Sequence, residues 1–116
     1  MTGAVGHHGG LAAEQIAENA YLEGGYEVLE RRWRGEAGEI DLILRRGGVI
    51  RFVEVKKART HARAAERINQ RQWARIQLAA QEYAGTRDLE LDFEMQFDVA
   101  LVDGQGRLEI IEAAFF

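Results

Sequence analysis

The sequence predicts an α/β sandwich, in which helices cover a mixed central sheet of about five strands. Stretches with helical periodicity alternate with short apolar stretches of strand length, in the order α-β-β-β-α-β-β. The chain has 116 residues, of which 47% are hydrophobic. This size and composition are typical of one domain with a single core.

The first helix is expected over residues 11–23. Its small and apolar side chains recur on one stripe at about 100° per residue. They are Ala13, Ile16, Ala17 and Ala20. Gly24-Gly25 should end this helix, because glycine adopts the left-handed conformation that closes a helix. Residues 1–9 are expected to form a flexible, glycine-rich N-terminus, and residues 10–116 the single domain.

Runs of β-branched and aromatic residues, separated by glycine turns, predict the strands. The expected strands are 26–34, 39–45, 49–57, 93–102 and 107–111. The second and third form a hairpin across Arg46-Gly47-Gly48, and the last two meet at the turn Asp103-Gly104-Gln105-Gly106. Residues 62–84 are expected to form one long helix.

Composition excludes two classes of protein. No apolar run approaches the ~18 residues that a membrane span needs, so no membrane partner is expected. The chain has no cysteine, which excludes disulfides and thiolate metal sites and fits a reducing cytoplasm.

The charges are unevenly distributed, although the net charge is only −4. Residues 31–75 hold thirteen of the fifteen lysines and arginines but five of the nineteen acids, a local balance of +8 against −12 elsewhere. A local field of this sign attracts a polyanion, which favours a nucleic-acid partner. The alternative is that the arginines only solvate a helix and a hairpin.

Charged residues interrupt the apolar pattern of the hairpin. On the strand 49–57, Glu54 and Lys56 continue a face begun by Ile50 and Phe52, where a buried side chain is expected. Asp41 lies on the neighbouring strand. Carboxylates held close raise each other's pKa unless a cation lies between them, so these acids indicate a divalent metal beside a lysine, a combination suited to attack on phosphodiesters. The alternative is a simple Glu54–Lys56 ion pair at a strand end.

The expected helix 62–84 carries a cationic stripe, with arginines spaced four apart. They are Arg63, Arg67, Arg71 and Arg75. Gln72 lies within the opposite, apolar face of this helix. It is either a satisfied core amide or a group that reaches the acidic cluster.

Seven blocks of the sequence match, in order, a family of small bacterial proteins. They are Gly10-Leu11-Ala12-Ala13-Glu14-Gln15-Ile16-Ala17, Gly25-Tyr26, Arg32-Trp33-Arg34, Gly38-Glu39-Ile40-Asp41-Leu42-Ile43, Phe52-Val53-Glu54-Val55-Lys56, Phe97-Asp98-Val99 and Ala114-Phe115. Over residues 10–115 the chain therefore resembles the YraN family. This resemblance implies a PD-(D/E)xK, restriction-endonuclease-like fold and a likeness to archaeal Holliday-junction resolvases.

The resemblance also implies the site residues. Asp41 and Glu54 correspond to the metal-binding acids, and Lys56 to the catalytic lysine. Glu14 corresponds to the helical glutamate that completes the acidic site, and Gln72 falls where the superfamily often has lysine or glutamine.

Two positions depart from the family pattern. Arg32 stands where the family usually has asparagine. Lys57-Ala58 replaces the usual threonine-arginine after the core lysine, and Arg59 is a candidate substitute for that arginine.

The resulting hypothesis is a metal-dependent endonuclease. Mg²⁺ or Mn²⁺ would be held by Asp41, Glu54 and the main-chain carbonyl of Val55, because hard cations prefer oxygen ligands. Lys56 would orient or deprotonate the attacking water, or neutralise charge on the phosphate, and Glu14 would help to place a second ion or the water. Arginines would hold the phosphates of branched or single-stranded DNA, recognised by shape. These are Arg31, Arg34, Arg59, Arg63, Arg67, Arg71 and Arg75.

Two alternatives belong to other classes. One is a nucleic-acid-binding module that does not cleave and keeps the acids for metal-stabilised structure. The other is a structural homodimer that pairs through Ile110-Ile111 and Phe115-Phe116. A homodimer is compatible with either activity.

Overall fold

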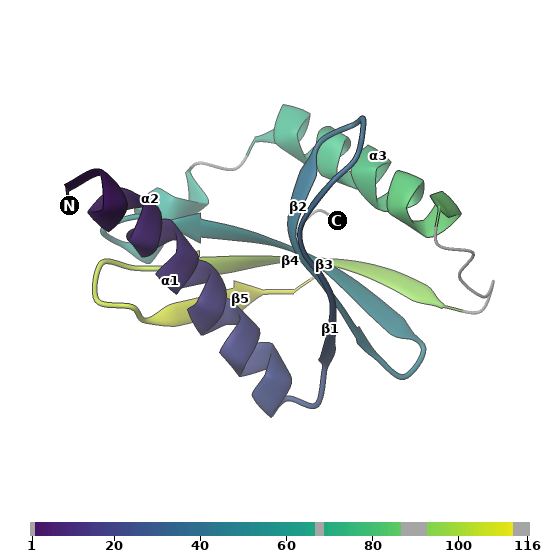
Figure 1. Cartoon of the computed structure of the whole chain (residues 1–116), viewed down its shortest axis with the longest axis horizontal. Helices are drawn as coiled ribbons and strands as arrows, with labels where there is room; N and C mark the ends of the chain where they lie inside the picture. The colour runs from purple at the N-terminus through teal and green to yellow at the C-terminus, as the bar shows by residue number, and fades with distance from the viewer. Residues whose placement is uncertain (1, 67–68, 87–92, 113–116) are drawn as a thin grey trace.

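The computed structural model describes residues 2–66, 69–86 and 93–112, with side chains from residue 12 onward (Figure 1). The elements follow the expected order, with the second helical region divided in two. They are α1 (Thr2–Glu23), β1 (Glu27–Arg34), β2 (Glu39–Arg46), β3 (Val49–Lys57), α2 (His61–Ala65), α3 (Gln70–Thr86), β4 (Glu94–Val102) and β5 (Leu108–Ile111). The α/β class with a five-stranded mixed sheet is therefore confirmed.

The strands lie side by side in the order β1-β2-β3-β4-β5. β3 and β4 are parallel, and the other neighbours are antiparallel. The segment containing α2 and α3 joins β3 to β4, as parallel strands require a long connection. β3 is central and buried on both faces. Phe52 packs in the hydrophobic cluster that includes residues of α3, and Val53 packs in the one that includes residues of α1.

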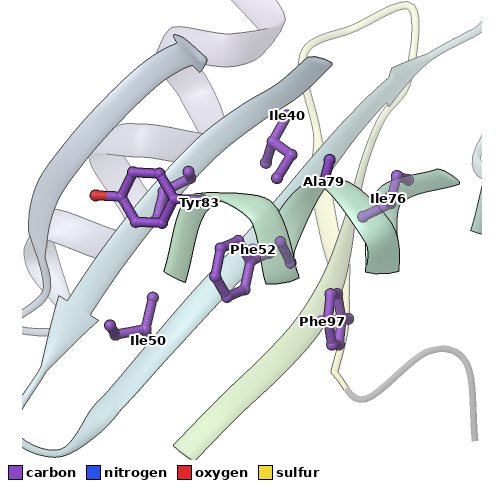
Figure 2. Packing of buried hydrophobic residues seen from close by; sticks show 9 residues of the cluster. Ile40, Ile50, Phe52, Ile76, Ala79, Tyr83 and Phe97 are labelled. Atoms are coloured by element: carbon purple, nitrogen blue, oxygen red, sulfur yellow. The ribbon is translucent and has the colours of Figure 1, made fainter. Parts of the chain in front are cut away.

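Helices cover the two faces of the sheet (Figure 1). Figure 2 shows Ile76, Ala79 and Tyr83 of α3 against the strands, where they meet Phe52 and Phe97. On the other face, α1 packs through small side chains and Tyr21 against β2, β3 and β4. This arrangement places the hydrophobic core in two layers, one on each side of the sheet.

A buried ion pair lies on the α1 face. The Asp98 carboxylate accepts hydrogen bonds from the Tyr21 hydroxyl at 2.6 Å and from Arg51 Nη1 at 2.8 and 3.0 Å. Arg51 Nε donates in turn to the Tyr26 hydroxyl at 2.7 Å. Both oxygens of this fully buried carboxylate therefore have partners, and the network ties α1 to β3 and β4.

Gly25 ends α1, as the sequence predicts. The Tyr26 N–H donates to the Tyr21 carbonyl at 3.1 Å and the Gly25 N–H to the Leu22 carbonyl at 3.1 Å, which is a Schellman motif. Gly25 has φ +88, in the left-handed region. The Tyr21 and Tyr26 rings pack edge to face at 5.6 Å across this turn. At its other end α1 begins at Thr2, earlier than residue 11, and whether residues 1–9 are flexible stays a prediction.

The prediction of one helix over 62–84 is wrong. The structure has α2 and then a separate α3, because Asn69 caps a new helix. Asn69 Oδ1 accepts from the Gln72 N–H at 2.8 Å, and its carbonyl accepts from the Trp73 N–H at 3.1 Å. The predicted arginine stripe is therefore not continuous: Arg63 lies on α2, and Arg67 lies outside the described residues.

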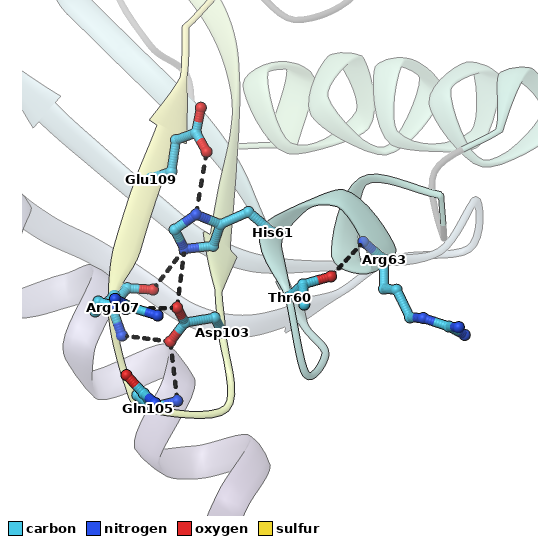
Figure 3. A network of polar contacts seen from close by, with 7 residues as sticks. All are labelled: Thr60, His61, Arg63, Asp103, Gln105, Arg107 and Glu109. Atoms are coloured by element: carbon cyan, nitrogen blue, oxygen red, sulfur yellow. Dashed lines mark hydrogen bonds and ion pairs between the residues drawn. The ribbon is translucent and has the colours of Figure 1, made fainter.

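The turn between β4 and β5 is organised by Asp103, as Figure 3 shows. Its carboxylate accepts from the main-chain N–H groups of Gln105 and Arg107, both at 2.9 Å, and from Arg107 Nε at 2.8 Å. His61, at the start of α2, places Nε2 2.8 Å from the Arg107 carbonyl and Nδ1 3.2 Å from Glu109 Oε2. The turn predicted at 103–106 thus also anchors α2.

Two expectations on partners are only partly tested by the fold. Within the described part of the chain, no helix is long and apolar enough to cross a membrane. Of the apolar residues expected to form a dimer, Ile110 packs beside the α1-face core and Ile111 is 36% exposed. Phe115-Phe116 lies outside the described residues, so the homodimer stays a prediction.

We predict that Gly25→Ala lowers the free energy of unfolding by about 1–2 kcal/mol, because a Cβ is disfavoured at positive φ. The added Cβ would have Arg46 Cδ at 3.6 Å as its nearest neighbour, so the effect is conformational and not a clash. Gly85→Ala is the matched control: Gly85 is the penultimate residue of α3, has no positive φ and has nothing within 4 Å of an added Cβ, so alanine should not destabilise the protein. Urea unfolding of both variants measures these effects, and a Gly25→Ala variant as stable as the parent would contradict the prediction.

Candidate metal centre

The candidate site lies where β2 separates from β3. The two strands pair regularly from Arg46↔Val49 to Leu42↔Val53, and this is the last pair before Asp41 and Glu54. There the Asp41 side chain accepts the hydrogen bond of the Val55 N–H, at 2.8 Å from Oδ2. The Asp41 carboxylate thereby lies against β3 beside Glu54.

The structure brings three of the predicted site residues together. Glu54 and Lys56 share one face of β3, and Lys56 Nζ lies 3.8 Å from Glu54 Oε2. Asp41 is close enough for its charge to act on Glu54, and Lys56 acts on both carboxylates. The ion pair at the strand end is thus present, but it is part of a larger cluster.

Glu54 is the most constrained residue of the site. It is 6% exposed, and its Oε2 accepts from Gln72 Nε2 at 3.3 Å. Its other oxygen, Oε1, is buried without a hydrogen-bond partner among the described residues. A buried carboxylate oxygen without a partner is costly, so this atom is suited to bind a cation.

The pKa values of both acids are raised. Burial, followed by the charge of Asp41, raises the pKa of Glu54 to about 8, with Lys56 opposing. Burial also raises the pKa of Asp41, opposed by the Val55 N–H and Lys56. Because both carboxyls resist ionisation together, a divalent cation between them would stabilise the ionised pair.

The donor set fits a hard cation. Glu54 and Asp41 offer carboxylate oxygens, and the Val55 carbonyl belongs to the residue whose N–H holds Asp41. Across the described ranges no group of three or more His, Asp or Glu side chains is placed to hold a metal ion. Two carboxylates completed by main-chain oxygen and water form a set that Mg²⁺ accepts, since Mg²⁺ usually keeps several waters.

Gln72 reaches the acidic cluster, which was one of the two alternatives left open by the sequence. Its side chain donates to Glu54, and its main-chain N–H bonds to Asn69 Oδ1. The cap that begins α3 therefore also positions Gln72. Glu82, near the other end of α3, accepts from the main-chain N–H groups of Glu36 at 2.8 Å and Ala37 at 3.2 Å.

Glu14 does not join the two carboxylates directly. Its Oε2 lies 3.7 Å from Arg32 Nε, and Arg32 Nε lies 3.9 Å from Glu39 Oε1. Glu14 and Arg32 line a pocket of about 290 Å³ between α1 and the sheet. Its other lining residues are Gln15, Glu18, Arg31 and Leu42. Glu14 therefore contacts the site through Arg32.

Sequence reasoning missed Arg32 and Glu82. Arg32 has φ +52, which no strand pattern predicts, so its direction was not predictable from alternation. Glu82 acts on main-chain groups of a turn 45 residues away or more, and no local motif marks such a contact.

The expected phosphate-binding arginines are dispersed over several elements. Arg31 forms a bidentate pair with Glu18, at 2.6 and 3.0 Å, and this hydrogen bond lowers the pKa of Glu18. Arg34 lies 3.4 Å from Glu39 Oε2. The remaining described members of the set are exposed and lie after β3, on α2 and on α3: they are Arg59, Arg63, Arg71 and Arg75. A common nucleic-acid surface stays a prediction.

We predict that Glu54→Gln stabilises the metal-free protein, and increasingly so as the pH rises from about 5 to about 8. The folded-state pKa of Glu54 lies above its ordinary value of 4.5, so the ionised carboxylate is disfavoured in the fold and wild-type stability falls across this range. Glutamine does not titrate, and the difference should reach on the order of 1–3 kcal/mol at the alkaline end. Thermal unfolding in a chelator at several pH values tests this, with Glu66→Gln, an exposed glutamate, as the control. An offset between wild type and variant that does not change with pH would contradict it.

The chain is similar to the proteins of one bacterial family. The model of the uncharacterised protein family UPF0102 matches residues 13–102. A UPF0102 protein of Cereibacter sphaeroides is 50% identical over 115 residues, which cover 99% of this chain and 98% of that protein. One from Ruegeria pomeroyi is 50% identical over 109 residues, 94% of this chain and 89% of that protein. A third, from Roseobacter denitrificans, is 44% identical over 112 residues, which cover 97% of this chain and 87% of that protein.

Proposed function

The chain belongs to UPF0102, the YraN family, and on this premise we propose that it is a metal-dependent endonuclease that hydrolyses phosphodiesters of branched or single-stranded DNA. The observation that carries the proposal is the buried Oε1 of Glu54, without a hydrogen-bond partner in the described part of the chain and beside Asp41 and Lys56. Such an oxygen is expected where a cation completes the site.

Each residue of the proposed site has its own role in the reaction. Asp41, Glu54 and the Val55 carbonyl would hold Mg²⁺ or Mn²⁺, which would supply a Lewis acid for the charge that develops on the phosphate. Water adds to phosphorus, the bond to the leaving oxygen breaks, and the leaving oxygen takes a proton from solvent. Lys56 orients that water or neutralises charge on the phosphate, and the proton of the attacking water leaves to solvent. Gln72 holds Glu54 in place.

Arginines of the basic segment hold the flanking phosphates. The segment 31–75 has a local charge of +8, and binding through phosphates weakens steeply as salt rises. Phosphate contacts fix position but do not read sequence, so the proposed enzyme recognises DNA shape. The proposed role is in DNA recombination or repair.

Non-cleaving nucleic-acid binding is the second candidate. One observation favours it: the described residues offer two carboxylates and no third at the centre. Such a module would bind DNA in a salt-sensitive manner and would show no magnesium-dependent nicking.

We predict that Lys56→Ala slows cleavage by about 10²-fold or more while DNA binding changes little, because the lysine acts on the reacting groups. The assay uses labelled junction, flap, duplex and single-stranded DNA with and without Mn²⁺. Asp41→Asn should have a comparable effect. Lys57→Ala is the matched control, because Lys57 is exposed and lies on the other face of the same strand.

Equal cleavage by the Lys56→Ala and Lys57→Ala variants would refute the nuclease proposal. DNA binding by every variant, without nicking by the wild type, would favour the non-cleaving module. An unfolding curve of each variant excludes loss of fold as the cause.

A further inference from the structure

Two adjacent arginines of β1 are held in different ways. Arg31 forms a short, bidentate pair with Glu18, at 2.6 and 3.0 Å. Among the described side chains, Arg32 makes only long ion pairs, at 3.7 Å to Glu14 and 3.9 Å to Glu39, and its own side chain is 50% exposed. Arg31 therefore holds α1 against β1, whereas the Arg32 side chain is held by the longer ion pairs with Glu14 and Glu39.

The backbone conformation of Arg32 is unusual for a residue within a strand. Its φ of +52 is in the left-handed region, which is unfavourable for a residue with a Cβ. In the β1–β2 register Arg31 pairs with Leu42 and Trp33 pairs with Ile40, so Arg32 lies at the level of Asp41. Arg31 contacts Glu18 of α1, whereas Trp33 packs on the α3 face, so the alternation of faces breaks at the left-handed residue between them. Arg32 contacts Glu39 of β2 as well as Glu14 of α1.

Two glutamates lie beside the guanidinium of Arg32. Glu14 and Glu39 lie within 4 Å of its Nε. Burial raises the pKa of Asp41, and the charge of Arg32 is one of the effects that lower it. Both of these contacts run through Nε, so they do not use the four N–H donors of the two terminal nitrogens.

We propose that Arg32 supplies the second positive charge of the centre, so that the site binds a single divalent ion and the Arg32 guanidinium contacts a phosphate of the bound nucleic acid. This inference rests on the proposed function. A guanidinium is a permanent cation with a planar fork of donors, which suits a phosphate group as well as carboxylates. Because Arg32 lies within 4 Å of Glu14 and Glu39, its charge offsets theirs. With Arg32 between them, these described acids are not placed as a group that holds an ion.

Metal stoichiometry tests the first half of the inference. Calorimetric titration of the intact protein with Mn²⁺ should give about one ion per chain for the wild type and about two for Arg32→Asn. Asparagine tolerates the left-handed region, so this variant should keep the backbone conformation. Arg31→Asn, on the same strand, should still bind about one ion.

DNA binding without cleavage tests the second half. In a chelating buffer, Arg32→Asn should weaken binding of a labelled junction several-fold and reduce the slope of log K against log salt by about one. Arg32→Lys keeps the charge but not the fork, so it should retain about one ion while its junction affinity falls.

The outcomes separate this inference from the proposed function. Two ions bound by the wild type, or one ion and an unchanged salt slope for Arg32→Asn, would overturn the role of Arg32 and leave the nuclease proposal intact. No Mn²⁺ bound by any variant, with no cleavage, would remove the proposed function and this inference together. Unfolding curves of all variants confirm that each is folded before the comparison.

Discussion

The hydrogen bond between the Val55 N–H and the Asp41 carboxylate is the contact on which the arrangement of the site depends. In a regular antiparallel pair, a main-chain carbonyl of the neighbouring strand accepts such a bond. Here a side chain accepts the bond instead. β2 can therefore separate from β3 while the Val55 N–H keeps a hydrogen-bond partner. The opening that results lies within the sheet. Asp41 and Glu54 are buried enough there for their pKa values to be raised, and they still lie near the surface.

Helix α3 fixes this opening from both of its ends. Near its first turn, Gln72 bonds to Glu54, and near its last turns Glu82 binds the main chain of the β1–β2 connection. The two residues are ten positions apart, which corresponds to about 15 Å along the helix axis. One rigid helix therefore sets the distance between the strand that carries Glu54 and the connection that leads into Asp41.

Much of this fold was predictable from the sequence, because its strands obey simple rules. Alternation and glycine turns gave all five strands to within a few residues, and Gly24-Gly25 gave the end of α1. The division of the second helix was missed, since the periodicity of 62–84 continues across a cap that only Asn69 signals. A single capping residue within a helical pattern is more often solvated than structural, so composition alone does not decide the matter.

The site was predictable to the extent that it depends on neighbouring strands. Alternation on β3 and the adjacent hairpin strand were sufficient to bring Glu54 and Lys56 near Asp41. The contact of Gln72 and the position of Arg32 were not decidable, because one depends on how α3 docks and the other on a left-handed residue within a strand. Both are tertiary properties that local patterns do not encode.

The network of Tyr21, Asp98 and Arg51 has a consequence for the position of an acid that lies about two turns earlier on α1. Small side chains such as Ala17 form a smooth helix face, against which a helix can rotate or shift along its axis at little cost. A buried hydroxyl that is hydrogen-bonded to a carboxylate fixes the rotation of the helix about its axis and its position along that axis. Tyr21 and Glu14 are seven residues apart, or about two turns, so they share a side of the helix. The polar bond within the core therefore determines which acid α1 presents to Arg32.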